Sequence, residues 1–206
     1  EEKEEEIQEW WESEDIYEKV KETHEDDPNW YFLDGPPYAS GTIHLGTAWN
    51  KLIKDTILRM KTMQGHNVRR QPGWDCHGLP IEVKVEEKLD VESKKDIEEK
   101  YGIRKFIDEC KSWATEHVDI MSDQFKRLGV WMDWDDPYLT FKNDYIDSVW
   151  WTLKQAQKRD LMEKRSQVIQ WCPRCETALA EHEVRGEYRQ IKNPSLYARF
   201  KLTYTN

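Results

Sequence analysis

An apolar run that breaks at glycine and proline and continues as a helical pattern constrains the fold of this chain more than any other feature. The run covers 30–33, the loop at 34–44 holds two prolines and two glycines, and apolar residues then recur at helical spacing. This order predicts a strand at 30–34 and a helix at 43–63. Such a junction places backbone N–H groups and His44 at a helix N-terminus, a binding site for a nucleotide phosphate.

A second strand, at 66–71, completes the first structural unit. Gly65 stands where glycine commonly ends a helix, and the strand follows it directly. A strand, a crossover helix and a second strand form a right-handed βαβ unit, from which parallel sheets are built. Ligands bind outside the carboxyl ends of such strands, so we expect the loops at 34–44 and 72–79 to share one edge.

The rest of the chain predicts mostly helices, followed by short strands. Helices are expected at 3–23, 80–89, 93–101, 104–127 and 143–159, short strands around a cysteine pair after residue 167, and a final strand at 195–204. Together with the βαβ unit, this order indicates an α/β protein.

The net charge of −10 resides in the N-terminal segment. Residues 1–27 hold fourteen acidic and three basic residues, whereas the remaining residues hold 27 acidic and 28 basic ones. The acidity is typical of a solvated helix face and does not exclude a nucleic-acid partner for the rest. No apolar run of membrane-spanning length occurs, and the first residues are acidic rather than a basic, apolar signal. We therefore expect a cytoplasmic protein with no membrane partner.

His44, Gly46 and Thr47 form the first candidate catalytic site. When an acid is adenylated by ATP, negative charge develops on the phosphate oxygens, and an imidazole, backbone N–H groups and a helix dipole stabilise it. Gly46 has no Cβ and lets a nucleotide approach closely, while Gly41 allows the turn before the helix. The alternative is an ordinary helix N-terminus with a locally satisfied histidine. The full Pro-Pro-x-x-x-Gly-x-x-His-x-Gly pattern favours the nucleotide site.

Asp75 marks the second candidate site, within Gly-Trp-Asp-Cys-His-Gly. An aspartate at the carboxyl end of a strand can hold the ammonium group of a ligand. The alternative is that Asp75 caps the helix predicted at 80–89. Its expected place beside the first site favours ligand binding.

Cys172 and Cys175 form a Cys-x-x-Cys pair, and the other two cysteines are isolated. Without a secretory signal, this spacing favours metal binding or redox chemistry over a disulfide. We predict a zinc knuckle, of which the pair supplies half the ligands. His182 is a candidate third ligand, although its spacing is not diagnostic.

Four segments together resemble one family. They are Phe-Leu-Asp-Gly-Pro-Pro-Tyr at 32–38, His-Leu-Gly-Thr at 44–47, Arg-Gln-Pro-Gly-Trp-Asp-Cys-His-Gly-Leu-Pro at 70–80, and Trp-Cys-Pro-Arg-Cys-Glu-Thr at 171–177. Through them the chain resembles, over nearly its whole length, the N-terminal part of a class I aminoacyl-tRNA synthetase of the archaeal isoleucyl type. Valyl enzymes share the layout but usually carry a different loop before the histidine.

The resemblance implies a ligase that activates isoleucine with ATP and Mg²⁺ and transfers it to tRNA(Ile). It implies that His44 and Gly46 contact ATP, that Pro36 lies against the isoleucine side chain, and that Asp75 holds the ammonium group. The family also edits mischarged valine in an inserted domain. Isoleucyl enzymes are themselves the standard example of why one methylene is too little for discrimination by binding.

The implied organisation has four parts. An acidic N-terminal helix covers 1–27, the first half of a Rossmann-like (HUP-type) parallel-sheet catalytic domain covers 28–165, a zinc-knuckle segment covers 166–190, and a β-rich editing insertion begins at 191–206. A Lys-Met-Ser-Lys-Ser-like loop and a second Cys-x-x-Cys do not occur in the sequence. We therefore expect an N-terminal fragment whose catalytic site is incomplete.

One residue departs from the family pattern. The class I motif ends in His-x-Gly-His, and Thr47 stands at its last position. Threonine can hydrogen-bond a phosphate but lacks the charge of an imidazole. Three alternatives stay open: a valyl or leucyl member of the class, a non-catalytic zinc- and RNA-binding module, and an adenylyl transferase for a small substrate.

Overall fold

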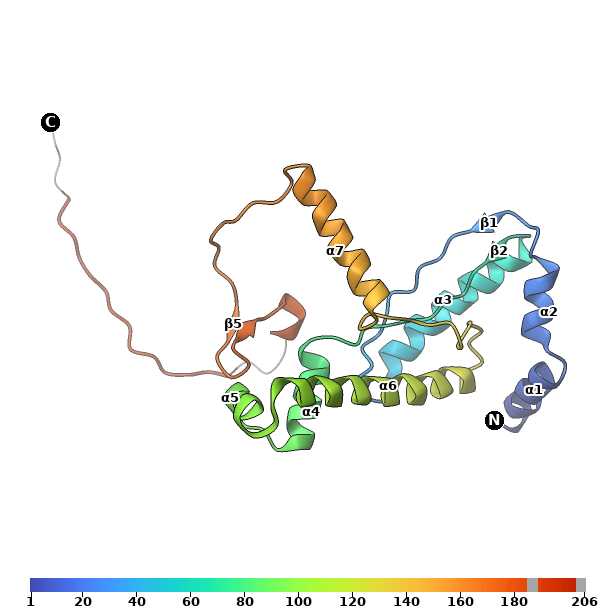
Figure 1. The fold of residues 1–206 in the computed structure, drawn as a ribbon, viewed down its shortest axis with the longest axis horizontal. Coiled ribbons are helices and arrows are strands. Elements are labelled where there is room, and N and C mark those ends of the chain that lie inside the picture. Colours follow the sequence, from blue (N-terminus) through green and yellow to red (C-terminus); the bar gives the residue numbers. More distant parts are fainter. Residues whose placement is uncertain (185–188, 203–206) are drawn as a thin grey trace. The chain divides into compact units, whose positions relative to one another are not determined.

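A computed structural model describes residues 1–184 and 189–202 (Figure 1). The chain divides into two compact units, Glu1–Arg165 and Ser166–Asn206, each of which is described by itself. Within the described ranges, no helix has both the length and the apolar content that crossing a bilayer requires.

Three segments of the first unit run parallel and side by side. β1 (Asn29–Trp30) pairs with β2 (Asn67–Val68), and β3 (Gly73–Trp74) pairs with β4 (Tyr138–Leu139). A further parallel bridge joins Tyr38 to Asp75. The segment that carries β2 and β3 therefore lies between the other two, and α3 (Leu45–Met63) forms the crossover. This confirms the predicted parallel α/β arrangement.

The strands are shorter than the sequence predicts. Regular pairing is limited to two residues in β1 and two in β2, instead of the predicted 30–34 and 66–71. Prolines at 28, 36, 37 and 72 flank the paired residues and supply no N–H donor to the ladders. Backbone hydrogen bonds nevertheless continue across them, from Asp75 N to Pro37 O at 2.9 Å and from Tyr138 N to Pro72 O at 3.0 Å.

The helices follow the prediction closely, with one exception. α4 (Leu79–Leu89), α6 (Ile103–Arg127) and α7 (Asn143–Lys158) form as expected, and α5 (Lys94–Asp96) with the π-helical turn η1 (Ile97–Tyr101) replaces the helix predicted at 93–101. The single N-terminal helix predicted within 1–27 is wrong. Asp15 adopts a left-handed backbone (φ 49°) and separates α1 (Glu2–Ser13) from α2 (Ile16–Thr23).

The core of the first unit lies where α3, α6 and the parallel segments meet. Leu58, Trp74 and Phe125 are completely buried there. The apolar residues from which α3 was predicted, such as Leu45 and Trp49, lie instead on its exposed face. The buried face of α3 carries charged residues, which are accommodated because each has an ionic partner.

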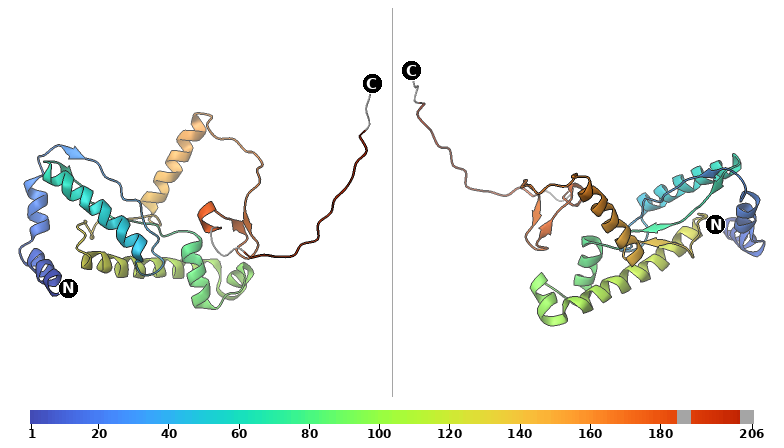
Figure 2. Two further views of the ribbon diagram at one scale, coloured as in Figure 1. Left: turned by 180° about the vertical axis from the view of Figure 1, so that it is seen from behind. Right: turned by 45° about the horizontal axis from the view of Figure 1, so that its top comes forward.

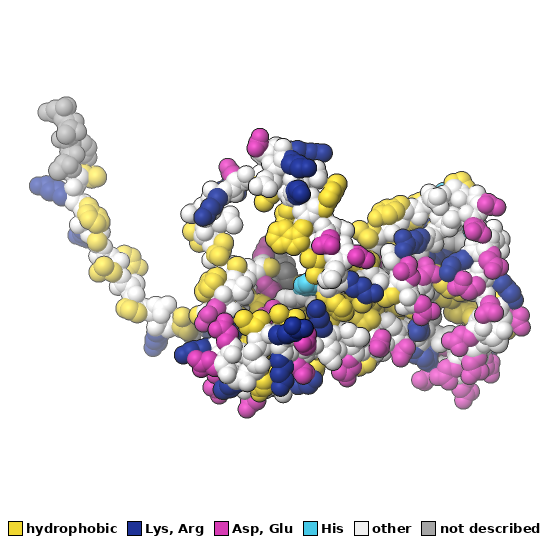
Figure 3. Space-filling view, in the orientation of Figure 1, with side chains coloured by type: hydrophobic (Ala, Val, Ile, Leu, Met, Phe, Trp, Pro, Cys, Tyr) yellow, Lys and Arg dark blue, Asp and Glu magenta, His cyan; other side chains and the backbone are white. Residues whose placement is uncertain are grey.

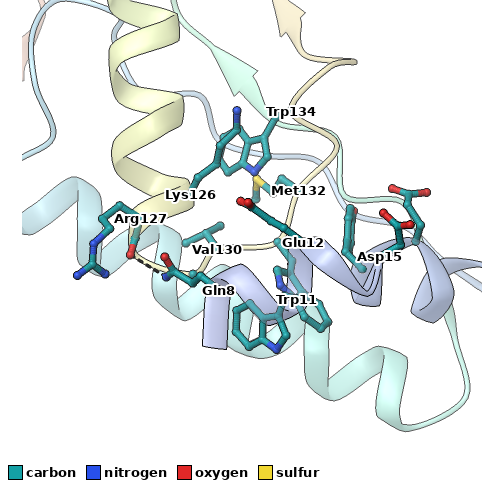
Figure 4. A pocket seen from close by; sticks show the side chains of 13 residues that line it. Gln8, Trp11, Glu12, Asp15, Lys126, Arg127, Val130, Met132 and Trp134 are labelled. Carbon is teal, nitrogen blue, oxygen red and sulfur yellow. Dashed lines mark hydrogen bonds between the residues drawn. The ribbon is translucent and has the colours of Figure 1, made fainter. Parts of the chain in front are cut away.

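The N-terminal helices pack against the end of α6 and the segment that follows it. Trp11 meets Trp131 edge to face at 5.0 Å, and Arg127 pairs with Glu4 at 3.4 Å. A cavity of about 340 Å³ lies at this contact, and Gln8 Nε2 donates to Arg127 O at 2.9 Å. Figure 4 shows the side chains that line this cavity. Acidic side chains gather over α1 in Figure 3, which agrees with the predicted solvated face.

α7 projects from the rest of the first unit in every view (Figure 2). None of its residues is buried, and Trp150 and Trp151 are 66% and 63% exposed. This helix therefore contributes little to the core of the unit.

The second unit contains a small antiparallel hairpin. It consists of β5 (Trp171–Cys172) and β6 (Thr177–Ala178), and a 3₁₀ turn η2 (Glu181–Glu183) follows. The strand predicted at 195–204 is not formed in its described part, because residues 195–202 have no paired neighbour there. Residues 203–204 lie outside the described residues. The β-rich segment predicted from 191 onward therefore has no strand between 191 and 202.

Candidate functional site

His44 is the residue that caps α3. Its Nδ1 accepts hydrogen bonds from Gly46 N at 3.0 Å and from Thr47 N at 3.4 Å. An Nδ1 that accepts carries no proton, so the ring proton resides on Nε2 and is available to a ligand. His44 can therefore cap the helix and bind a ligand at the same time, although the sequence analysis gives these two roles as alternatives.

Thr47 completes this cap as a capping box. Its Oγ1 accepts from His44 N at 2.8 Å and donates to His44 O at 2.9 Å. The hydroxyl thus both donates and accepts within the cap. This local role accounts for a threonine at the position without invoking a phosphate.

Gly46 makes room for the imidazole of His44. A Cβ at position 46 would lie 2.9 Å from His44 Cε1 and 3.1 Å from His44 Nδ1, closer than side chains normally approach. The cap therefore requires glycine here, independently of any nucleotide. At Gly41 a Cβ would meet no atom within 4 Å, and the backbone is not left-handed. The structural reason predicted for Gly41 is therefore not found.

Asp75 lies directly beside the loop of the first motif. Ala39 N donates to Asp75 O at 3.0 Å, so the two loops predicted to share an edge are neighbours. The half-buried Asp75 side chain accepts from His77 N at 3.3 Å, whereas α4 begins after Gly78 with no side-chain cap. The alternative that Asp75 caps this helix is therefore wrong.

A cavity of about 290 Å³ opens at the N-terminus of α3. Its lining consists of Gly35, Pro37, His44, Gly46, Thr47, Asn50, Lys51 and Phe125. All three predicted catalytic residues are in this lining. Pro36 is half-buried and lies in the sequence between Gly35 and Pro37, which both line the cavity. The cavity thus joins the proline loop to the histidine cap.

Three charged residues that the sequence reasoning missed lie at the base of this site. The carboxylate of Asp34 is buried and pairs with Lys51 and, at 2.8 Å, with Lys54. Burial lowers the pKa of Lys51, and the neighbouring Asp34 opposes that shift. One sequence signal could have indicated this cluster. Lys51 and Lys54 are three residues apart and therefore lie on one face of the helix, opposite its apolar residues.

Cys172 and Cys175 lie at one end of the hairpin of the second unit. Cys175 N donates to Cys172 Sγ at 3.3 Å, and this bond is the main reason why the pKa of Cys172 is lowered. Burial raises the pKa of Cys175. Among the described side chains, no group of three or more His, Cys, Asp or Glu is placed to hold a metal ion. The side chain of His182 lies outside this description.

Comparison with known proteins gives three consistent results. A family model for class I tRNA synthetases (I, L, M and V) matches residues 6–202. Isoleucine–tRNA ligase of Pyrococcus horikoshii is 61% identical over 199 residues, and that of Methanopyrus kandleri is 58% identical over 205 residues. These alignments cover 97% and 98% of this chain but 19% of each relative. The chain therefore spans about a fifth of the length of these curated relatives.

A solved structure shows the same fold at lower sequence identity. It is the ternary LeuRS-tRNA-LeuAMS complex of Agrobacterium radiobacter K84 agnB2, with a TM-score of 0.62 and 21% identity. The match covers 88% of this chain and 20% of that one. At this identity the likeness supports the α/β fold alone.

Proposed function

This chain belongs to the class I tRNA synthetase family, and on that premise we propose that it is the N-terminal part of an isoleucine–tRNA ligase. The observation that carries the proposal is the cap of α3. There Nδ1 of His44 serves the helix, and Nε2–H stays available at the cavity that His44 lines. The high identity to isoleucine–tRNA ligases over nearly the whole chain supports isoleucine as the amino acid.

The proposed chemistry is adenylate formation. The carboxylate of isoleucine attacks the α-phosphorus of Mg²⁺-bound ATP, and pyrophosphate leaves. His44 Nε2–H and the N-terminus of α3 stabilise the negative charge that develops on the phosphates. Gly46 and Gly41 border the nucleotide, and Thr47 acts by holding the cap. Pro36 contacts the side chain of isoleucine, and the Asp75 carboxylate binds its ammonium group.

Amino-acid-dependent exchange of pyrophosphate into ATP tests this function. The measurement uses the full-length protein, because the 206 residues contain no Lys-Met-Ser-Lys-Ser-like loop. Isoleucine is expected to support exchange better than valine by about 10- to 200-fold, the range that such enzymes show for one methylene. A preference for valine or leucine would contradict the proposal. Tight tRNA binding without ATP binding, lost on chelation, would instead indicate an RNA-binding zinc module.

Later steps of the proposed reaction involve parts outside this chain. The acyl group passes from the adenylate to tRNA(Ile), and an inserted domain hydrolyses mischarged valine. The described residues 191–202, where we place the start of that insertion, carry no strand, so editing stays a prediction for the full-length protein.

Replacing Asp75 with asparagine is expected to raise the KM for isoleucine by about 10- to 100-fold, because a charge-assisted hydrogen bond to the ammonium is lost. The KM for ATP should change little. Asp136→Asn is a suitable control, since Asp136 forms an exposed pair with Arg69 at 2.9 Å. An equal rise in both KM values would indicate a distorted loop rather than a lost ammonium contact.

We further propose that Cys172 and Cys175 supply half of a structural zinc site. Zinc prefers four thiolate or imidazole ligands, and the Cys175 N–H bond to Cys172 Sγ favours a thiolate. The full-length protein is expected to hold about one zinc ion at this site, and Cys172→Ser or Cys175→Ser should remove it. Elemental analysis measures the content, with Cys110→Ser as the control. Full zinc retention in both variants would contradict the proposal.

A further inference from the structure

We propose that Asp34 is a positioning residue that fixes the two substrate-binding loops relative to each other, an inference that rests on the proposed function. Its side chain is buried, with 1% of the residue exposed. One carboxylate oxygen accepts from Lys51 and from Gly73 N at 3.0 Å, and the other accepts from Lys54 at 2.8 Å. Asp34 thereby joins α3, which His44 begins, to the backbone two residues before Asp75.

The backbone carbonyl of Asp34 extends this connection to the third parallel segment. It accepts a hydrogen bond from the hydroxyl of Tyr138 in β4. Burial raises the pKa of Tyr138 to about 12, so the hydroxyl remains a donor at neutral pH. One residue of the first parallel segment thus contacts the crossover helix and the two other parallel segments that form the edge of the site.

The proline loop is held by the same cluster. Lys54 Nζ donates to Gly35 O at 2.9 Å, in addition to its bond with Asp34. Gly35 lines the cavity and precedes Pro36, the residue proposed to contact isoleucine. A change at Asp34 therefore affects the amino-acid end and the nucleotide end of the cavity together.

Asp34 and Lys51 are both buried, so bulk solvent does not easily replace a lost partner. Lys51 Nζ lies 5.8 Å from the ring centre of Trp74 and 5.4 Å from that of Phe125, both completely buried. An ammonium left there without its carboxylate is strongly unfavourable, so Lys51 must move or lose its proton if Asp34 loses its charge. Since Lys51 lines the cavity one turn after Thr47, its movement changes the geometry of the site.

Steady-state exchange kinetics of Asp34→Asn in the full-length protein test the inference. Small misplacements of bound reactants cost about 100-fold in rate, so kcat/KM is expected to fall by about that factor for isoleucine and for ATP alike. Asp34→Asn combined with Lys51→Met removes both buried charges. The double variant should recover the thermal midpoint without recovering kcat/KM. If Asp34→Asn alone does not fold, the kinetics of the double variant are compared with those of the unaltered protein instead.

Asp55→Asn is the matched control. Asp55, like Asp34, is a buried carboxylate, and it lies within α3. It pairs with Arg59 at 2.6 Å and accepts from Trp131 N at 3.1 Å, and neither partner belongs to the two substrate-binding loops. This variant should lose thermal stability while its kcat/KM stays within about threefold of that of the unaltered protein, because Asp55 shares no ionic or hydrogen-bond partner with Asp34.

Several results would overturn the inference. They are unchanged kinetics for either substrate in Asp34→Asn, full kinetic recovery in the double variant, and an equal kinetic loss in Asp55→Asn. If the unaltered protein shows no isoleucine-dependent exchange, the proposed function fails, and the inference fails with it. Normal exchange in the unaltered protein with unchanged Asp34→Asn kinetics overturns the inference alone.

Discussion

His44→Ala is expected to lower kcat for isoleucine-dependent pyrophosphate exchange by about 10²- to 10³-fold. That range is typical when one pre-positioned donor to a developing negative charge is removed. The variant also loses the cap of α3, because Gly46 N and Thr47 N both donate to His44 Nδ1. Loss of such a cap costs about 1 kcal/mol of the free energy of unfolding. Exchange at saturating isoleucine and ATP, together with thermal unfolding, measures both effects.

His44→Asn separates the two effects. Asparagine is among the preferred N-cap residues, so its side-chain oxygen can accept from the freed N–H groups of α3. It cannot place an N–H where imidazole Nε2 lies, because its side chain is shorter. We therefore expect an unfolding midpoint near that of the unaltered protein and an activity as low as that of His44→Ala. Normal activity in His44→Asn would show that His44 acts only as a cap.

The sequence predicted the parts of the fold that local rules govern. Gly65 has positive φ and ends α3, as the sequence predicts for a helix-terminating glycine. The parallel order of the first two strands followed from the βαβ order, and the shared edge of the loops at 34–44 and 72–79 followed from their place at the carboxyl ends of those strands. These features depend on residues that are near in sequence or on a general topological rule.

The Asp34 cluster could not be predicted in the same way. Lys51 follows Asp34 by 17 residues and Gly73 follows it by 39, so their contact depends on the completed packing of three elements. Apolar periodicity also identified the wrong face of α3, because it treats a lysine as a surface residue unless an ionic partner is known. The strand prediction for residues 195–202 was wrong for a related reason. Alternating apolar and polar residues form a strand only where a partner strand is present.

Gly73→Ala is expected to destabilise the first unit by about 1–3 kcal/mol, the usual cost of overpacking a filled core. A Cβ at position 73 would overlap the ring of Tyr138, which β3 and β4 hold in register. Tyr138 would have to leave its stacked position on Tyr145 and its hydrogen bond to the carbonyl of Asp34. For a chain of this size the unfolding midpoint should fall by roughly 2–12 °C.

Two further variants show whether this loss comes from the contact with Tyr138. Gly41→Ala adds a Cβ that meets no atom within 4 Å, so its midpoint should stay near that of the unaltered protein. Tyr138→Val shortens the side chain that the new Cβ would meet. In that background Gly73→Ala should cost much less than it does alone, because mutations of residues in contact are not additive. Additive losses would mean that the glycine is required for another reason, such as backbone freedom, and that the register of β3 and β4 does not depend on the fit of Tyr138 over Gly73.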